Sequence, residues 1–149
     1  MARVCFVGDT DLNLGYELLS RETSREALST YDIEEPFDNS LAVDTVSLGA
    51  AVSLCNDLDW YLRRFVTEAF VRDPSISSTE WLSLDLATAI RETDVRPEES
   101  DQLLKIYGLS DGTLVEPMYA ARRGTEIPPY DLRDVDETVV VRVSETEFA

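Results

Sequence analysis

The feature that most constrains this chain is a run over residues 49–72 in which apolar side chains recur at steps of three and four. That spacing places them along one side of an α-helix and gives the helix a wide apolar stripe. Asp73-Pro74 ends the run, because a residue that precedes proline disfavours the helical conformation. The pattern predicts one long amphipathic helix whose stripe packs against the rest of the domain.

Weaker patterns predict the remaining elements. β-Prone apolar runs predict strands over residues 2–8, 41–47, 105–109, 113–121 and 138–143. Further helices are predicted over 13–31, in one piece or in two with a second start near 23, over 77–93, and over about 97–104. The capping box of Ser77 and Glu80 marks one helix start, and Ser110-Asp111-Gly112 predicts a hairpin turn. Residues 127–130, which contain two prolines, predict an extended loop.

The order of these elements predicts an α+β (mixed α/β) fold. About five strands form a mixed sheet that packs against the long helix, with two to three further helices. A chain of 149 residues fits one domain, so residues 1–149 are expected to fold as a single unit.

The charge balance narrows the environments in which such a chain could work. The sequence has 30 acidic and 13 basic residues, a formal net charge of -17, and Lys105 is its only lysine. Such a charge repels itself in dilute buffer, but at about 1 M salt the Debye length falls to roughly 3 Å. The acidic residues are spread along the chain rather than grouped. This favours the hydrated surface of a halophilic cytoplasmic protein over an acidic surface built for a basic partner.

No pattern indicates export or a membrane span. Arg3 and Gly8-Asp9 interrupt the apolar run near the N-terminus, so no signal peptide is predicted. Apolar runs of about eighteen residues, the length that a transmembrane helix needs, do not occur. Cys5 and Cys55 lie among apolar residues, which predicts small buried side chains rather than a disulfide.

The sequence contains no histidine. This excludes Ser-His-Asp and Cys-His catalysis, histidine-ligated zinc, and the side chain that most often acts as a general base near neutral pH. Whether the protein is an enzyme is left open, and the absence favours a protein that is not one.

Two carboxylates follow the first predicted strand. Asp9 and Asp11 could share one Mg²⁺ that also holds a substrate phosphate. Haloacid-dehalogenase-like phosphatases and receiver domains carry acids at that place, but Asn13 and Lys105 do not match the remainder of their patterns. The favoured alternative is that Asp9 makes a turn and Asp11 or Asn13 caps the next helix. A metal-dependent phosphotransferase or hydrolase, with Asp9 and Asp11 as its metal ligands, is the second hypothesis.

A polar face of the long helix is the first candidate for partner binding. Asn56, Asp59 and Arg63 follow one side of that helix at three- and four-residue steps, with Trp60 beside them as an aromatic anchor. The alternative is a solvated stripe in which Asp59 pairs with Arg63 and Trp60 lies at the edge of the core.

Two adjacent arginine pairs give a third hypothesis. If Arg63-Arg64 and Arg122-Arg123 converge in space, they could hold a carboxylate ligand or a nucleic-acid phosphate, the latter in RNA or a ribonucleoprotein. No basic stripe with interleaved aromatic residues supports this, so nucleic acid is the less favoured partner.

Two longer segments carry a resemblance. Residues 17–28 and 47–62, the second with Asn-Asp-Leu-Asp-Trp-Tyr at 56–61, resemble a family of small haloarchaeal proteins of unknown function. The resemblance extends to residues 116–119 and to the last predicted strand. It implies a haloarchaeal cytoplasmic origin and assigns no catalytic residue.

These observations favour a non-enzymatic interaction or regulatory domain with an unidentified protein partner. No catalytic residue and no cofactor is predicted, and Mg²⁺ enters only under the second hypothesis.

Overall fold

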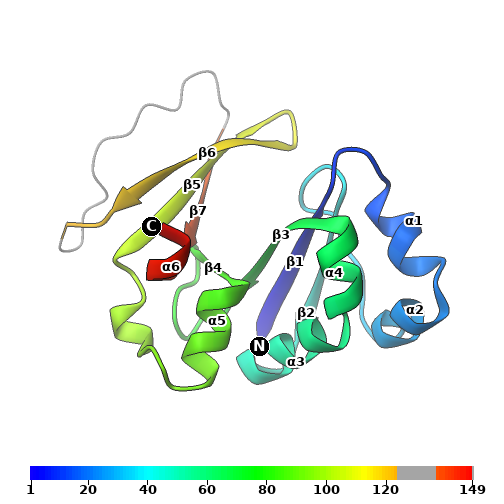
Figure 1. Cartoon of the computed structure of the whole chain (residues 1–149), viewed down its shortest axis with the longest axis horizontal. Helices are drawn as coiled ribbons and strands as arrows, with labels where there is room; N and C mark the ends of the chain where they lie inside the picture. The colour runs from blue at the N-terminus through cyan, green and yellow to red at the C-terminus, as the bar shows by residue number, and fades with distance from the viewer. Residues whose placement is uncertain (124–136, 149) are drawn as a thin grey trace.

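In the computed structural model, which describes residues 1–123 and 137–148, seven strands form one mixed sheet (Figure 1). The strands are β1 (Ala2–Gly8), β2 (Ser40–Thr45), β3 (Val66–Arg72), β4 (Trp81–Ser83), β5 (Leu103–Ser110), β6 (Thr113–Ala121) and β7 (Glu137–Arg142). The helical elements are α1 (Leu14–Leu19), α2 (Glu22–Leu28), α3 (Leu48–Asp57), α4 (Asp59–Phe65), α5 (Leu84–Arg91), the 3-10 turn η1 (Pro97–Glu99) and α6 (Glu145–Phe148).

The strand order is β2-β1-β3-β4-β7-β5-β6. Neighbouring strands are antiparallel except β4 and β7, which are parallel. The predicted α+β class and mixed sheet are therefore confirmed. The predicted number of about five strands is wrong, because β3 and β4 formed where helices were expected.

The long helix predicted over residues 49–72 is also wrong. The helical path breaks at Leu58 into α3 and α4, and the last seven residues of the run form β3. Phe70 and Val71 are adjacent in sequence and both are fully buried, one on each face of the sheet. A strand covered on both faces loses the alternation of apolar and polar residues, so its apolar positions fit a helical spacing equally well.

The helix predicted over residues 77–93 begins later than expected. The Ser77 hydroxyl accepts the backbone N–H of Glu80 at 3.0 Å, as a capping residue would, but the turn leads into β4. Helix α5 starts only after Ser83, whose hydroxyl accepts the N–H of Leu86 at 3.1 Å. The helix predicted over about 97–104 shortens to the 3-10 turn η1, because β5 already begins at Leu103.

The sequence predicted the hairpin turn after β5 and the start of α1 correctly. Asp111 and Gly112 have φ of 51° and 84°, and Ser110 pairs with Thr113, which makes the predicted two-residue hairpin turn. The segment 13–31 forms two helices, and the Asn13 side chain caps the first of them by accepting the N–H of Tyr16. The loop predicted over 127–130 lies outside the described residues.

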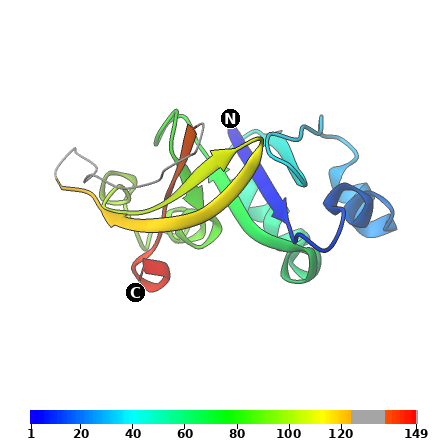
Figure 2. The same ribbon diagram turned by 90° about the horizontal axis from the view of Figure 1, so that it is seen from above.

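The two faces of the sheet carry separate cores. Helices α1 to α5 pack on one face, against apolar side chains of β1 to β4. The other face, called here the second face, carries a core that includes Cys5, Phe70, Trp81 and Tyr107. Figure 2 shows the β5–β6 hairpin arching so that its turn reaches the N-terminal half, where the Asp38 N–H donates to the Gly112 carbonyl at 2.8 Å. Among the described residues, no helix is long and apolar enough to cross a membrane.

Candidate functional site

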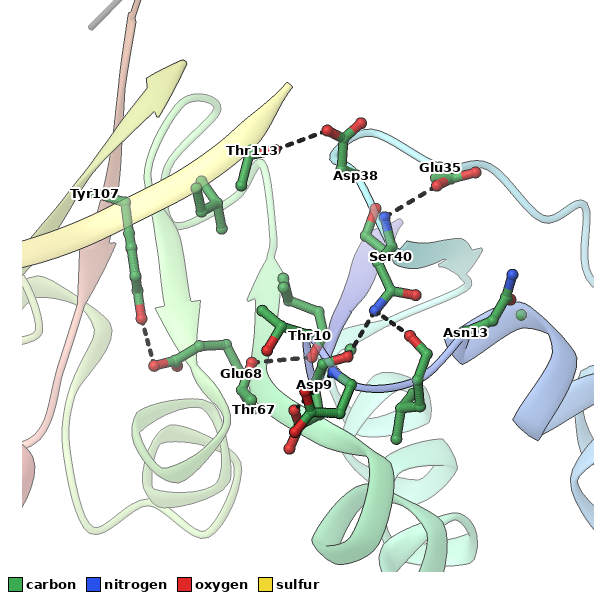
Figure 3. A pocket seen from close by; sticks show the side chains of 17 residues that line it. Asp9, Thr10, Asn13, Glu35, Asp38, Ser40, Thr67, Glu68, Tyr107 and Thr113 are labelled. Carbon is green, nitrogen blue, oxygen red and sulfur yellow. Dashed lines mark hydrogen bonds between the residues drawn. The ribbon is translucent and has the colours of Figure 1, made fainter. Parts of the chain in front are cut away.

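A pocket of about 880 Å³ opens where the loop after β1, the loop before β2, the start of β3 and the β5–β6 hairpin meet (Figure 3). Its described lining contains no arginine or lysine and has five carboxylates, which belong to Asp9, Asp11, Glu35, Asp38 and Glu68. It is called the acidic pocket below. Such a lining attracts cations and hydrogen-bond donors and repels phosphate.

Asn39 holds the loop after β1 in place. Its Nδ2 donates to the carbonyl oxygens of Asp9 and Leu12, both at 2.9 Å, and its Oδ1 accepts the N–H of Leu14 at 2.8 Å. Asn39 has a φ of 53°, which asparagine tolerates better than most residues. Gly8 makes room for it, because a Cβ on Gly8 would lie 2.7 Å from Asn39 Nδ2. Sequence reasoning missed Asn39, since its partners lie far away along the chain.

The predicted metal ligands Asp9 and Asp11 both line the acidic pocket. One carboxylate oxygen of Asp9 accepts the backbone N–H of Asp11 at 3.1 Å. Asp9 therefore forms the turn that the sequence favoured over a metal site. Within residues 1–123 and 137–148, no group of three or more Asp, Glu, His or Cys side chains is arranged to hold a metal ion. The Mg²⁺ site therefore remains a prediction, and the acidic lining argues against a bound phosphate.

Glu68 connects the acidic pocket to β5. Its carboxylate accepts hydrogen bonds from the Lys105 ammonium and from the Tyr107 hydroxyl. Burial raises the pKa of Tyr107, and the hydrogen bond to Glu68 raises it further. The phenol therefore stays protonated and acts as a donor, not as a base. Lys105 is committed to an ion pair, so it does not supply the free lysine that phosphoryl transfer chemistry would use at this pocket.

The two cysteines offer no reactive thiol. Cys5 and Cys55 are free and buried, and burial raises the pKa of each thiol to about 12. Both thiols therefore remain protonated at neutral pH and pack as small apolar groups, as the sequence predicted.

A second candidate lies on α4 and the α1–α2 junction. This aromatic–arginine surface consists of Arg21, Trp60, Arg63, Arg64 and Phe65. The Arg64 guanidinium carbon lies 3.8 Å from the centroid of the Trp60 ring, and Arg64 Nη1 donates to the Trp60 carbonyl at 3.0 Å. The Arg21 guanidinium lies 4.9 Å from the Phe65 ring and 5.9 Å from the Trp60 ring. Two cations thus approach the Trp60 ring, and one of them, Arg21, also approaches the Phe65 ring.

The structure brings together only some of the residues predicted for partner binding. Asp59 and Arg63 form an ion pair of 2.9 Å on α4, as one alternative expected, but Trp60 is 48% exposed. Asn56 lies on α3, on the other side of the break at Leu58, so the predicted continuous face is divided between two helices. Arg21 was missed, because only the fold brings the α1–α2 junction to α4. Phe65 was missed because the predicted long helix assigned it to the apolar stripe.

The second arginine pair lies elsewhere. Arg122 donates to Glu80 at 2.7 Å and to the Asp101 carbonyl at 2.9 Å, and only 10% of its side chain is exposed. Arg122 and Arg123 follow the C-terminal end of β6, which lies in the left half of Figure 1, whereas α4 lies in the right half. The two arginine pairs do not converge. The RNA hypothesis required that they lie close together, so the structure does not support it.

The fold and its surfaces define a mixed α+β domain with an acidic pocket and a separate aromatic–arginine surface. The chain belongs to a family of unknown function (DUF5804), whose model matches residues 2–109. The matched segment contains the whole aromatic–arginine surface and excludes Arg122 and Arg123. Comparison with curated proteins and with solved structures gave no match.

Proposed function

We propose that this protein is a non-enzymatic interaction domain that binds a partner protein through the aromatic–arginine surface, in the cytoplasm of a haloarchaeal cell. The observation that carries the proposal is Trp60, which is half exposed while the guanidiniums of Arg64 and Arg21 lie over its ring. Tryptophan and arginine are the residues most enriched among those that contribute most to protein–protein binding.

The local charge supports the same assignment. The chain has 13 basic residues against 30 acidic ones, yet Arg21 and Arg64 both lie over the exposed indole of Trp60. Arg21 is paired with Glu17 and the neighbouring Arg63 with Asp59, which leaves the charge of Arg64 for a partner. Molar salt screens attraction beyond about 3 Å, so a partner must be held by direct contacts. Apolar ring surface and stacked guanidiniums are contacts of this kind.

The geometry of Arg64 lowers the entropy that binding would cost. Stacking on Trp60 and the hydrogen bond to the Trp60 carbonyl hold this guanidinium in one place before a partner arrives. An arginine that is already ordered loses less rotamer freedom on binding. No carboxylate among the described residues pairs with Arg64, so most of its donors remain open.

The test is affinity capture with the purified protein in molar KCl, from extract of the source cells after nuclease treatment. Trp60→Ala and Arg64→Ala are each expected to reduce the captured partner about tenfold or more. Trp60→Phe, which keeps an aromatic ring, should retain most of it. Arg25→Ala is the matched control, because Arg25 is an exposed arginine on α2, outside the surface.

Two outcomes would contradict the proposal. Equal capture by all four variants would place the partner on another surface. A wild-type protein that captures no partner, or only nuclease-sensitive material, would exclude a protein-binding function. Melting temperatures equal to that of wild type would show that each variant is folded.

A further inference from the structure

Arg3 and Arg72 lie directly opposite each other on the neighbouring antiparallel strands β1 and β3. Both side chains belong to the second face, because Cys5 and Phe70, two residues away on the same strands, lie in its core. Like charges placed directly opposite on paired strands destabilise a sheet. The pair therefore needs a compensating negative charge.

Among the described residues, carboxylates compensate the charge of Arg3 but not that of Arg72. Arg3 donates to Glu34 at 3.0 Å and to Asp44 at 3.3 Å. Arg72 forms no hydrogen bond and no ion pair within the part of the chain that the structure describes, and its guanidinium carbon lies 4.4 Å from the centroid of the Trp81 ring. This half-buried cation therefore has no carboxylate partner among the described residues, although the chain has 30 acidic residues.

A cavity lies in front of both arginines. Its volume is about 600 Å³, within the range of small-molecule sites, and it is separate from the aromatic–arginine surface. Phe37, Trp81, Leu109 and Val139 give it apolar walls.

The cavity lining also contains three carboxylates, of Glu34, Glu80 and Glu137, and none of them forms an ion pair with Arg72. Glu80 accepts hydrogen bonds from Arg122 and Arg142, and Glu34 is held by Arg3. The arginine thus presents its donors to the cavity beside the buried indole of Trp81, which is 5% exposed.

We infer that this cavity binds a small organic carboxylate with an apolar body. The carboxylate oxygens would accept two parallel N–H bonds from Arg72, the geometry in which a guanidinium binds a planar anion best. Arg3 would supply a second positive charge, and the apolar body would pack against Trp81 and Phe37. The bound anion offsets the repulsion between the two arginines. This inference does not depend on the proposed partner surface.

The probe for the test is benzoate, with benzyl alcohol as its neutral match and inorganic phosphate as the second anion. Trp60 and Trp81 are the two tryptophans of the chain, so a Trp60→Phe background leaves Trp81 as the reporter. In molar KCl, benzoate is expected to change the Trp81 emission saturably, and benzyl alcohol is not. Arg72→Gln should weaken benzoate binding about tenfold or more, because the charge-assisted pair is lost.

Arg96→Gln is the matched control, since it removes an exposed arginine that does not line the cavity. Arg72→Gln should also leave the melting temperature of the ligand-free protein equal or higher, because one of two opposed charges is gone. Lack of saturable benzoate binding, equal binding of benzyl alcohol, or equal affinity in the Arg72→Gln and Arg96→Gln proteins would overturn the inference. Tighter binding of phosphate would overturn the carboxylate assignment. A marked loss of stability in Arg72→Gln would show that Arg72 supports the fold instead.

Discussion

Asp38 and Gly112 join two parts of the chain that are far apart in sequence. The Asp38 N–H donates to the Gly112 carbonyl at 2.8 Å, and the Asp38 carboxylate accepts the hydroxyl of Thr113, the next residue, at 2.7 Å (Figure 3). These bonds hold the hairpin turn against the loop before β2 and so close one side of the acidic pocket. The strand order alone would leave β2 and β6 at opposite edges of the sheet.

Gly112→Ala tests this junction. Gly112 has a φ of 84°, and an added Cβ would lie 3.0 Å from Asp38 Oδ1. Alanine is strained in that conformation, so the free energy of unfolding is expected to fall by about 1–2 kcal/mol. Denaturant unfolding in molar KCl measures this free energy. Gly15→Ala is the control, because its Cβ would meet only Asn13 Oδ1 at 3.5 Å and alanine favours the helix. Equal losses of stability in the two variants would show that the turn at Gly112 does not stabilise the junction with Asp38.

Glu80 makes the second long-range junction. Its carboxylate accepts bonds from Arg122 at 2.7 Å and from Arg142 at 2.8 Å, and 10% and 11% of these arginine side chains are exposed. Glu80→Gln leaves two mostly buried cations with a neutral partner, so stability should fall by about 3 kcal/mol. Glu98→Gln, at an exposed site on η1, should change it little. A loss no larger than that of the control would show that the arginines find other partners.

The same carboxylate predicts a pH dependence. Burial by itself raises the pKa of Glu80, but the hydrogen bonds and charges of Arg122 and Arg142 outweigh it, and the pKa lies below its ordinary value of 4.5. The folded state therefore binds this proton more weakly than the unfolded state. The stabilisation is complete above pH 4.5 and is lost as the pH falls through the lowered pKa. The free energies of unfolding of wild type and Glu80→Gln should therefore converge in that acidic range. A difference between them that does not change with pH would show that ionisation of Glu80 does not contribute to stability.

Part of this fold could be predicted from sequence because one local signal decided each element. Asp111-Gly112 suits a turn with two positive φ angles, and Asn13 suits a helix start. β3 could not be predicted, because Phe70 and Val71 are buried on both faces of a central strand and leave no alternation. Ser77 bonds as a helix cap does, yet pairing of β4 with β3 and β7 prevails over its local preference.

The candidate sites divide in the same way. Trp60 and Arg64 could be predicted to lie close together, since they are one helical turn apart. Arg21 joins them only through the packing of α1 against α4, and Arg3 meets Arg72 only through strand register. Such contacts depend on the whole topology, and no local pattern encodes them.

The net charge of -17 predicts how stability responds to salt. Repulsion among the carboxylates opposes the folded state, and about 1 M salt reduces the Debye length to roughly 3 Å. The melting temperature should therefore rise by several degrees between dilute buffer and molar KCl, and choline chloride should act similarly if screening is the cause. Asp32→Asn and Asp94→Asn, at exposed sites, should raise the melting temperature in dilute buffer and leave it unchanged in molar salt. A melting temperature independent of salt would mean that the carboxylates do not repel one another enough to matter, and the surface would then have to be explained by a basic partner.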